Sequence, residues 1–149
     1  MSRAKRLQPV QEMIDDAERR LAQSVAGCEQ RLREAETKLQ ELQRYLEEYR
    51  QQFSNSAARG MGVTGLRDYQ AFLAKLGDAI RQQGDLVQRL RAERDAERLR
   101  WQDAARRAKA LDHVTDQWRN EERQAQDRRE QRDSDERAQR SKPHQGMIQ

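Results

Sequence analysis

The stretch RLREAETKLQELQRYLEEYRQQF, residues 31–53, contains neither glycine nor proline, and an apolar side chain recurs in it every three or four positions. This spacing is typical of a helix that packs one face against another helix. From residue 25 to residue 53 all the positions of two heptad series are apolar: Val25, Leu32, Leu39, Leu46 and Phe53 in one, and Cys28, Ala35, Leu42 and Tyr49 in the other. The stretch therefore predicts a coiled-coil helix.

The heptad spacing extends upstream of this stretch to Leu7, with one shift of four residues between Leu21 and Val25. An insertion of four residues into a heptad pattern is a stutter, which locally unwinds the supercoil. Pro9 suits the first position of a helix, so we expect the first helix to span residues 9–53. Residues 54–65 carry three glycines together with Ser, Asn and Thr, and they predict a turn.

A second seam of heptad positions runs from Leu66 to Ala125, which predicts a helix over residues 66–125 or beyond. Five positions of this seam are polar: Gln83, Arg94, Glu97, Thr115 and Glu122. Because two of them are neighbours in mid-seam, packing there should be looser or should specify the register. Beyond this helix the apolar residues cease, and residues 126–149 are expected to form a polar tail that frays or is disordered.

Two amphipathic helices joined by a short turn predict an all-α fold, a long two-helix antiparallel coiled-coil hairpin that forms a single domain over residues 1–125. The second helix is expected to be the longer one. Reflecting the chain about the turn pairs Phe53 with Leu66 and Pro9 with Ala110. Trp118 would then lie on a stretch of the second helix that the first helix does not reach.

The amino-acid composition of the chain disfavours several classes of protein. Only 34% of the 149 residues are hydrophobic and 38% are charged, which argues against a compact globular core. The 30 basic and 26 acidic residues are interleaved and leave a net charge of +4, a pattern that disfavours a nucleic-acid partner. The single cysteine, Cys28, excludes an intrachain disulfide, and no apolar run approaches the roughly 18 residues of a membrane span. These features predict a cytoplasmic protein.

The sequence contains no pattern of catalytic residues. Its two histidines are His113 and His144, it has no phosphate-binding loop, and acidic pairs such as Glu47 and Glu48 fit a solvated helix face. We therefore expect no enzyme activity, no cofactor, no metal site and no small-molecule substrate.

Two groups of residues are candidates for partner binding. Phe72 lies beside the seam near the turn, where it either widens the core or presents an aromatic ring to a partner. Leu111, Val114 and Trp118 lie on the uncovered stretch of the second helix, where they either form a dimer seam, meet a first helix that starts before Pro9, or bind another protein. The last alternative draws support from the cations Arg119 and Arg123 nearby.

Three stretches resemble a known family. GCEQRLREAETKLQEL (residues 27–42), YLEEYRQQFSNS (residues 45–56) and GVTGLRDYQAFLAKLGDAIRQQ (residues 62–83) are similar, in order and in spacing, to the flagellar export protein FliJ family. The resemblance extends over most of residues 10–120. Its most specific features are ones that heptad spacing does not require, such as Gly27 next to Cys28 and the segment from Tyr69 to Phe72.

The resemblance implies a coiled coil similar to the central stalk of rotary ATPases, which binds and activates the hexameric export ATPase, contacts the export gate and escorts export chaperones. It implies a role in flagellum assembly and motility, with the protein cytoplasmic or held by partners at the cytoplasmic face of the inner membrane. The candidate contacts with the ATPase ring are Met13, Ile14, Leu111, Val114, Trp118, Arg119 and Arg123. The candidate contacts with the gate are Tyr69, Phe72 and Leu76. A stalk of a virulence-type secretion system, a nucleic-acid-binding coiled coil and a self-associating coiled coil are the alternatives.

Overall fold

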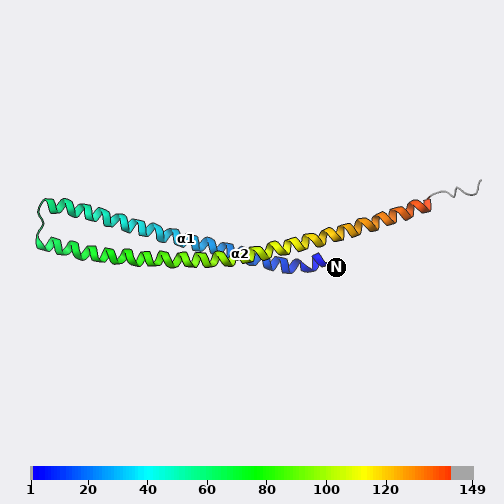
Figure 1. Cartoon of the computed structure of the whole chain (residues 1–149), viewed down its shortest axis with the longest axis horizontal. Coiled ribbons are helices and arrows are strands. Elements are labelled where there is room, and N and C mark those ends of the chain that lie inside the picture. Colours follow the sequence, from blue (N-terminus) through cyan, green and yellow to red (C-terminus); the bar gives the residue numbers. More distant parts are fainter. Residues whose placement is uncertain (1, 142–149) are drawn as a thin grey trace, which may run out of the picture. The chain divides into compact units, whose positions relative to one another are not determined.

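The computed structural model describes residues 2–141, which form two helices, α1 (Arg3–Ala58) and α2 (Val63–Ser141), without a strand among them (Figure 1). The helices contain 56 and 79 residues. The prediction of an all-α fold made of two long helices, the second longer than the first, is confirmed. Residues 142–149 of the predicted tail lie outside the described residues.

Helix α1 begins at Arg3, upstream of the predicted start near Pro9, which lies inside the helix. Ser2 caps it, because its Oγ accepts a hydrogen bond from the Lys5 backbone N–H at 3.2 Å. The prediction was wrong because proline was treated as a boundary. Proline costs an interior helix one backbone hydrogen bond, but the packing of the upstream turn offsets this loss, since Ala4 is only 5% exposed.

The turn is shorter than the predicted residues 54–65. Helix α1 continues past Phe53 to Ala58, and α2 resumes at Val63. Residues 54–58 are not helix breakers, and the chain leaves the helix only at Gly60, whose φ of 90° is a left-handed conformation that glycine adopts without strain. The Gly60 N–H donates to the Ala57 carbonyl at 3.1 Å and closes the end of α1.

Helix α2 continues beyond residue 125, as the prediction allowed, and reaches Ser141, so residues 126–141 of the predicted polar tail are helical. Residues 123–141 are exposed on every face, so tertiary packing does not hold them helical. Side chains four residues apart support the helix instead: Gln126 donates to Glu130 and Gln131 donates to Asp135, each at 3.3 Å. The prediction gave too much weight to the loss of apolar residues and too little to the helix propensity of Arg, Gln, Glu and Ala.

The described residues pack as two units. Residues 2–18 and 104–141 form the terminal unit, and residues 19–103 form the hairpin unit. In each unit a part of α1 runs antiparallel to a part of α2. Each unit is described by itself below.

The core of the hairpin unit lies along the predicted heptad seam. Leu32, Ala35 and Val87 form a buried cluster, against which Leu39, Leu86 and Leu90 pack. Gln83, one of the polar seam positions, is 8% exposed and donates its Nε2 to the Ala35 carbonyl at 3.0 Å. This amide therefore fixes the register of the two helices without leaving its donor unsatisfied.

The terminal unit has a smaller interior, formed by Ala4, Ala104 and Thr115. Arg3 forms an ion pair with Glu121 at 3.0 Å, and the Gln11 amide donates to the Asp112 carboxylate. Thr115 is 1% exposed and its Oγ1 has no hydrogen-bond partner. The terminal unit thus combines small apolar residues with polar contacts along its surface.

Candidate interaction surfaces

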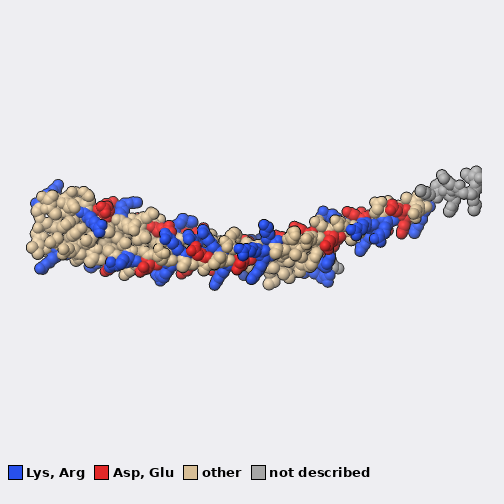
Figure 2. Space-filling model, in the orientation of Figure 1, with Lys and Arg blue, Asp and Glu red and all other residues tan. Residues whose placement is uncertain are grey.

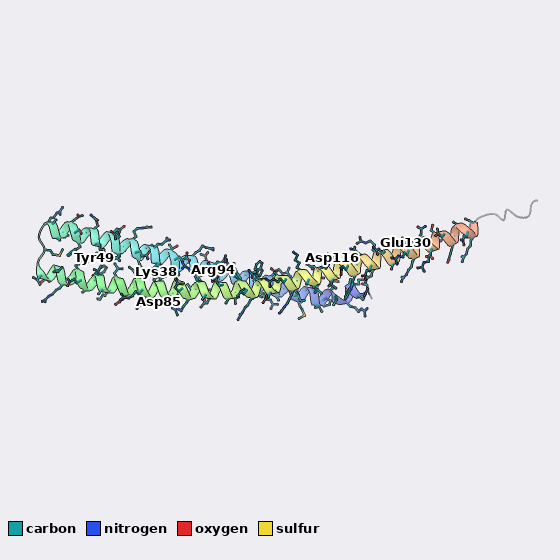
Figure 3. The ribbon with its side chains drawn as sticks, in the orientation of Figure 1. Lys38, Tyr49, Asp85, Arg94, Asp116 and Glu130 are labelled. Carbon is teal, nitrogen blue, oxygen red and sulfur yellow. The ribbon has the colours of Figure 1, made fainter. Side chains whose placement is uncertain are left out.

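Aromatic rings cluster beside the turn of the hairpin unit. Tyr45, Tyr49 and Phe53 come from α1, and Tyr69 and Phe72 come from α2. The rings of Phe53 and Tyr69 are stacked with centroids 3.6 Å apart, those of Tyr49 and Tyr69 are 5.4 Å apart, and those of Tyr49 and Phe72 are 4.4 Å apart. The cluster joins the two helices at the end where the chain turns back (Figure 3, Tyr49 labelled).

The three predicted gate residues are all placed on this part of α2. Tyr69 and Phe72 are partly buried against the α1 rings, and Leu76 is only 6% exposed. Phe72 therefore widens the core and also keeps part of its ring accessible. Tyr45, which meets the Phe72 ring edge-on at 5.9 Å and is 48% exposed, was missed by the sequence reasoning. The available signal was that Tyr45 directly precedes one seam position and Phe72 directly precedes another.

The turn itself exposes apolar side chains. Met61, Val63 and Leu66 are 37%, 70% and 41% exposed, and the turn end in Figure 2 is largely free of charged side chains. Met61 folds back over Gly65, where an added Cβ would come within 2.9 Å of the Met61 Cγ. The turn is therefore a defined apolar surface in which Gly65 makes room for Met61.

Trp118 is covered, contrary to the prediction that it lies on a free stretch of α2. The Arg3 guanidinium lies over the Trp118 ring, 4.9 Å from its centroid, and also pairs with Glu121. The alternative of a first helix that starts before Pro9 is the correct one. The stretch of α2 that α1 leaves uncovered begins at Arg123.

The other predicted ATPase contacts also fall in the terminal unit. Met13 is 71% exposed, whereas the side chains of Ile14, Leu111 and Val114 are partly buried. Arg119 and Arg123 are exposed. Arg119 also lines a hollow with Glu122 and residues of the first two turns of α1. The terminal unit thus contains both exposed apolar and exposed cationic groups.

The end of the hairpin unit away from the turn is polar, because the seam there carries Arg94 and Glu97 (Figure 3, Arg94 labelled). The Ser24 hydroxyl donates to the Glu97 carboxylate at 2.7 Å, and Arg100 pairs with the same carboxylate at 3.2 Å. Arg94 turns to Asp95 at 3.0 Å. Polar pairs therefore replace apolar packing at this level, as the two adjacent polar seam positions predicted.

Next to this polar level, Arg98 holds the carboxylate of Glu29. Two guanidinium nitrogens of Arg98 donate to Glu29 Oε1, at 2.6 and 3.2 Å. These hydrogen bonds, with the positive charges of Arg98, Arg33 and Arg94, lower the pKa of Glu29 from its ordinary value of 4.5. The pair is a cross-helix contact of the hairpin unit.

Among residues 2–141 no group of three or more His, Cys, Asp or Glu side chains is placed to hold a metal ion. Cys28 is buried in the hairpin unit at 4% exposure, and Arg31 Nη2 lies 3.3 Å from its Sγ. No helix in the described part of the chain has the length and apolar character that crossing a membrane requires.

Comparison with known proteins identifies the family. The model of the family described as flagellar FliJ protein matches residues 3–146, nearly the whole chain. The chain belongs to the FliJ family. No curated protein and no solved structure matches it.

Membership in the FliJ family assigns the chain a role in flagellar protein export. The resemblance seen in residues 27–42, 45–56 and 62–83 is confirmed by this match. All three stretches lie in the hairpin unit, on both sides of the turn. The family also fits the coiled-coil arrangement of α1 and α2.

Proposed function

We propose that this FliJ-family chain is a non-enzymatic stalk of the flagellar export apparatus that binds and activates the hexameric export ATPase and contacts the export gate. The observation that supports the proposal best is the family match over residues 3–146 of a two-helix fold. A second support is that exposed apolar residues occur in both units. Val10 and Met13 lie in the terminal unit, and the turn residues Met61, Val63 and Leu66 lie in the hairpin unit.

The terminal unit is the proposed ATPase contact. Val10 and Met13 are 44% and 71% exposed and lie three residues apart on α1. The cations Arg119 and Arg123 belong to the same unit. An apolar anchor accompanied by arginines suits a partner surface that has an apolar pocket with carboxylates near its edge.

The test is the ATP hydrolysis rate of the export ATPase from the same organism, titrated with this protein. We expect stimulation that saturates at less than one chain per ATPase subunit. The variant Met13→Glu should lose at least about tenfold in apparent affinity, which corresponds to roughly 1.4 kcal/mol. Leu99→Glu is the matched control, because Leu99 is 63% exposed but lies in the hairpin unit, and it should behave as the unmodified chain does.

Truncation after Glu122 examines the exposed end of α2 separately. It removes residues that are exposed and retains Thr115, Trp118 and Glu121, so the terminal unit keeps its packing. Lost stimulation would place part of the ATPase contact on residues 123–141. If the folded full-length chain fails to stimulate the ATPase at any ratio, the stalk proposal is wrong.

The aromatic cluster is the proposed gate contact, through Tyr69, Phe72 and Leu76. Because Leu76 is buried, its contribution is to hold the α2 rings in place. Phe72→Leu keeps an apolar side chain in the cluster but removes the ring. This variant should bind the cytoplasmic domain of the gate protein more weakly while it stimulates the ATPase normally, and unchanged gate binding would remove Phe72 from the contact.

Escort of export chaperones and location at the inner membrane through partners are further parts of the proposal. They rest on the family and on the absence of a membrane-crossing helix among residues 2–141. Sedimentation with inner-membrane vesicles should depend on the gate protein. Equal sedimentation with vesicles that lack it would argue for direct lipid binding.

A further inference from the structure

The two edges of the hairpin unit, where α1 and α2 meet on either side of the core, differ in charge. On one edge, cross-helix ion pairs bridge the helices, Glu29 with Arg98 at 2.6 Å and Glu36 with Arg91 at 3.6 Å. The partners recur every seven residues along each helix, the spacing at which coiled coils place such pairs beside the core. This edge is therefore closed by matched charges.

The opposite edge has cations without carboxylate partners. Arg31 and Lys38 are also seven residues apart on α1, but they line a groove with Leu86 and Leu90 of α2. Within the described residues neither cation forms an ion pair, and Arg31 Nη2 donates to the Cys28 thiol. Carboxylates lie near them without forming an ion pair: Glu34 lines this groove, and Glu93 and Glu97 line an adjacent hollow together with Arg31. Both cations can therefore still form an ion pair with a carboxylate of another molecule.

The floor of this groove is apolar. It has a volume of about 350 Å³, and its walls include Ala35, which is 6% exposed, and the partly buried side chains of Leu86 and Leu90. Leu86 does not belong to the seam, which uses Val87 and Leu90. The Gln83 amide at the floor already donates to the Ala35 carbonyl. The groove therefore offers apolar contact below and positive charge along its α1 side.

We propose that this groove docks an amphipathic helix of a partner protein whose apolar face is flanked by carboxylates. Seven residues of helix span about 10 Å, so Arg31 and Lys38 match carboxylates placed two turns apart on the incoming helix. Arg forms bidentate hydrogen bonds with carboxylates, which gives such a contact its direction.

A uniformly anionic partner fits the groove less well. Glu34 lies on the groove between Arg31 and Lys38, and Gln30 donates to it at 3.0 Å. A membrane surface or a nucleic acid would bring negative charge against this carboxylate, whereas a helix can place its acids only opposite the cations. The proposed site includes neither the residues proposed to contact the ATPase nor those proposed to contact the gate.

The test uses a fluorescently labelled helical peptide of roughly 20 residues, about 30 Å long, with leucines on one face and glutamates flanking them. Binding to the full chain is followed by fluorescence anisotropy. A second peptide carries lysines in place of the glutamates. We expect the glutamate peptide to bind saturably and the lysine peptide to bind at least about tenfold more weakly.

The variant Arg31→Glu with Lys38→Glu should weaken binding of the glutamate peptide by at least about tenfold. Its matched control is Arg44→Glu with Lys75→Glu, which makes the same change in net charge at exposed positions outside the groove. The control should change binding by less than about twofold. Leu86→Gln examines the apolar floor and should also weaken binding, with thermal unfolding showing that each variant is folded.

Three results would overturn the proposal. Equal binding of the two peptides would show that charge does not select the occupant. An equal loss in the control variant would show a nonspecific effect of net charge. Binding to anionic lipid vesicles that is weakened by Arg31→Glu with Lys38→Glu, without binding of the glutamate peptide, would assign the cations to a membrane surface instead.

Discussion

The turn end and the far end of the hairpin unit, away from the turn, follow the same heptad spacing but are held together by different forces. At the turn end, Tyr49 stacks on Tyr69 and packs against Phe72. At the far end, Ser24 donates to Glu97 and Arg98 holds Glu29. Rings contribute large buried apolar areas, whereas exposed ion pairs contribute roughly 0–1 kcal/mol each. Heptad spacing therefore fixes which residues face each other, but side-chain chemistry decides how strongly the helices adhere at each level.

This difference predicts where the hairpin opens. Local opening requires the loss of contacts at one level only, so levels with little buried apolar area open at the lowest free energy. Amide hydrogen exchange should therefore be faster around Glu97 than around Tyr49.

The largest effect is expected from Tyr49→Ala. The substitution removes the ring that contacts both Tyr69 and Phe72, and we expect it to lower the free energy of unfolding by about 3 kcal/mol. Tyr45→Ala is the control, because Tyr45 is 48% exposed and should cost clearly less. Thermal unfolding followed by circular dichroism measures both variants, and equal losses would show that the cluster is not centred on Tyr49.

At the far end of the hairpin unit, around Arg94 and Glu97, we expect a substitution to have a smaller effect and to stabilise the fold. Replacing Arg94 and Glu97 together by leucine should raise the free energy of unfolding by about 1–2 kcal/mol, because charges with 25% and 18% side-chain exposure give way to apolar packing. Arg89→Leu, at an exposed position outside the seam, serves as the control and should change little. A loss of stability in the double variant would mean that the contact of Ser24 with Glu97 stabilises this level more than apolar packing would.

The next effect concerns Gly84, which lies on α2 between the two regions. Nothing lies within 4 Å of a Cβ added at Gly84, so Gly84→Ala should stabilise the helix by about 1 kcal/mol. Gly65→Ala provides the contrast, because its Cβ would meet Met61 Cγ at 2.9 Å and the side chain would have to move. Urea unfolding compares the two, and a destabilised Gly84→Ala would indicate that the backbone there must approach another group closely.

Much of the fold could be predicted because heptad spacing depends on local sequence alone. The series from Val25 to Phe53 places Leu32 and Ala35 in the core, where the structure has them. The helix ends could not be predicted as well. The start at Arg3 depends on contacts with Trp118 and Glu121, residues more than a hundred positions away in the sequence. The end at Ser141 depends on helix propensity, which apolar periodicity does not measure.

The candidate surfaces were predicted less completely than the fold. Phe72 was recognised as lying beside the seam, but its contact with Tyr49 requires the register of the two helices, which the sequence specified only approximately. The contact that covers Trp118 was not predicted, because the start of α1 was placed at Pro9 and not at Arg3. That Arg31 and Lys38 line a groove with Leu86 and Leu90, and form no ion pair within the described residues, could be seen only once the register of the two helices was known.

The smallest effect is a dependence of stability on pH from Glu29. Arg98 lowers the pKa of Glu29 in the folded state below its ordinary value of 4.5. The unfolded chain therefore takes up a proton at a higher pH than the folded chain does. The stabilisation from Glu29 is complete above this ordinary value and is lost as the pH falls through the lower pKa of the folded state.

Glu29→Gln removes this titration, so the unfolding midpoint of the variant should fall less steeply between pH 5 and pH 3 than that of the unmodified chain, by a small margin. Glu41→Gln is the control, because Glu41 is exposed, forms no ion pair within the described residues and should leave the slope unchanged. If Glu29→Gln and the unmodified chain lose stability in parallel, the contact with Arg98 does not persist in solution. The far end of the hairpin unit would then lose one of its cross-helix polar contacts, which would widen the difference from the aromatic turn end.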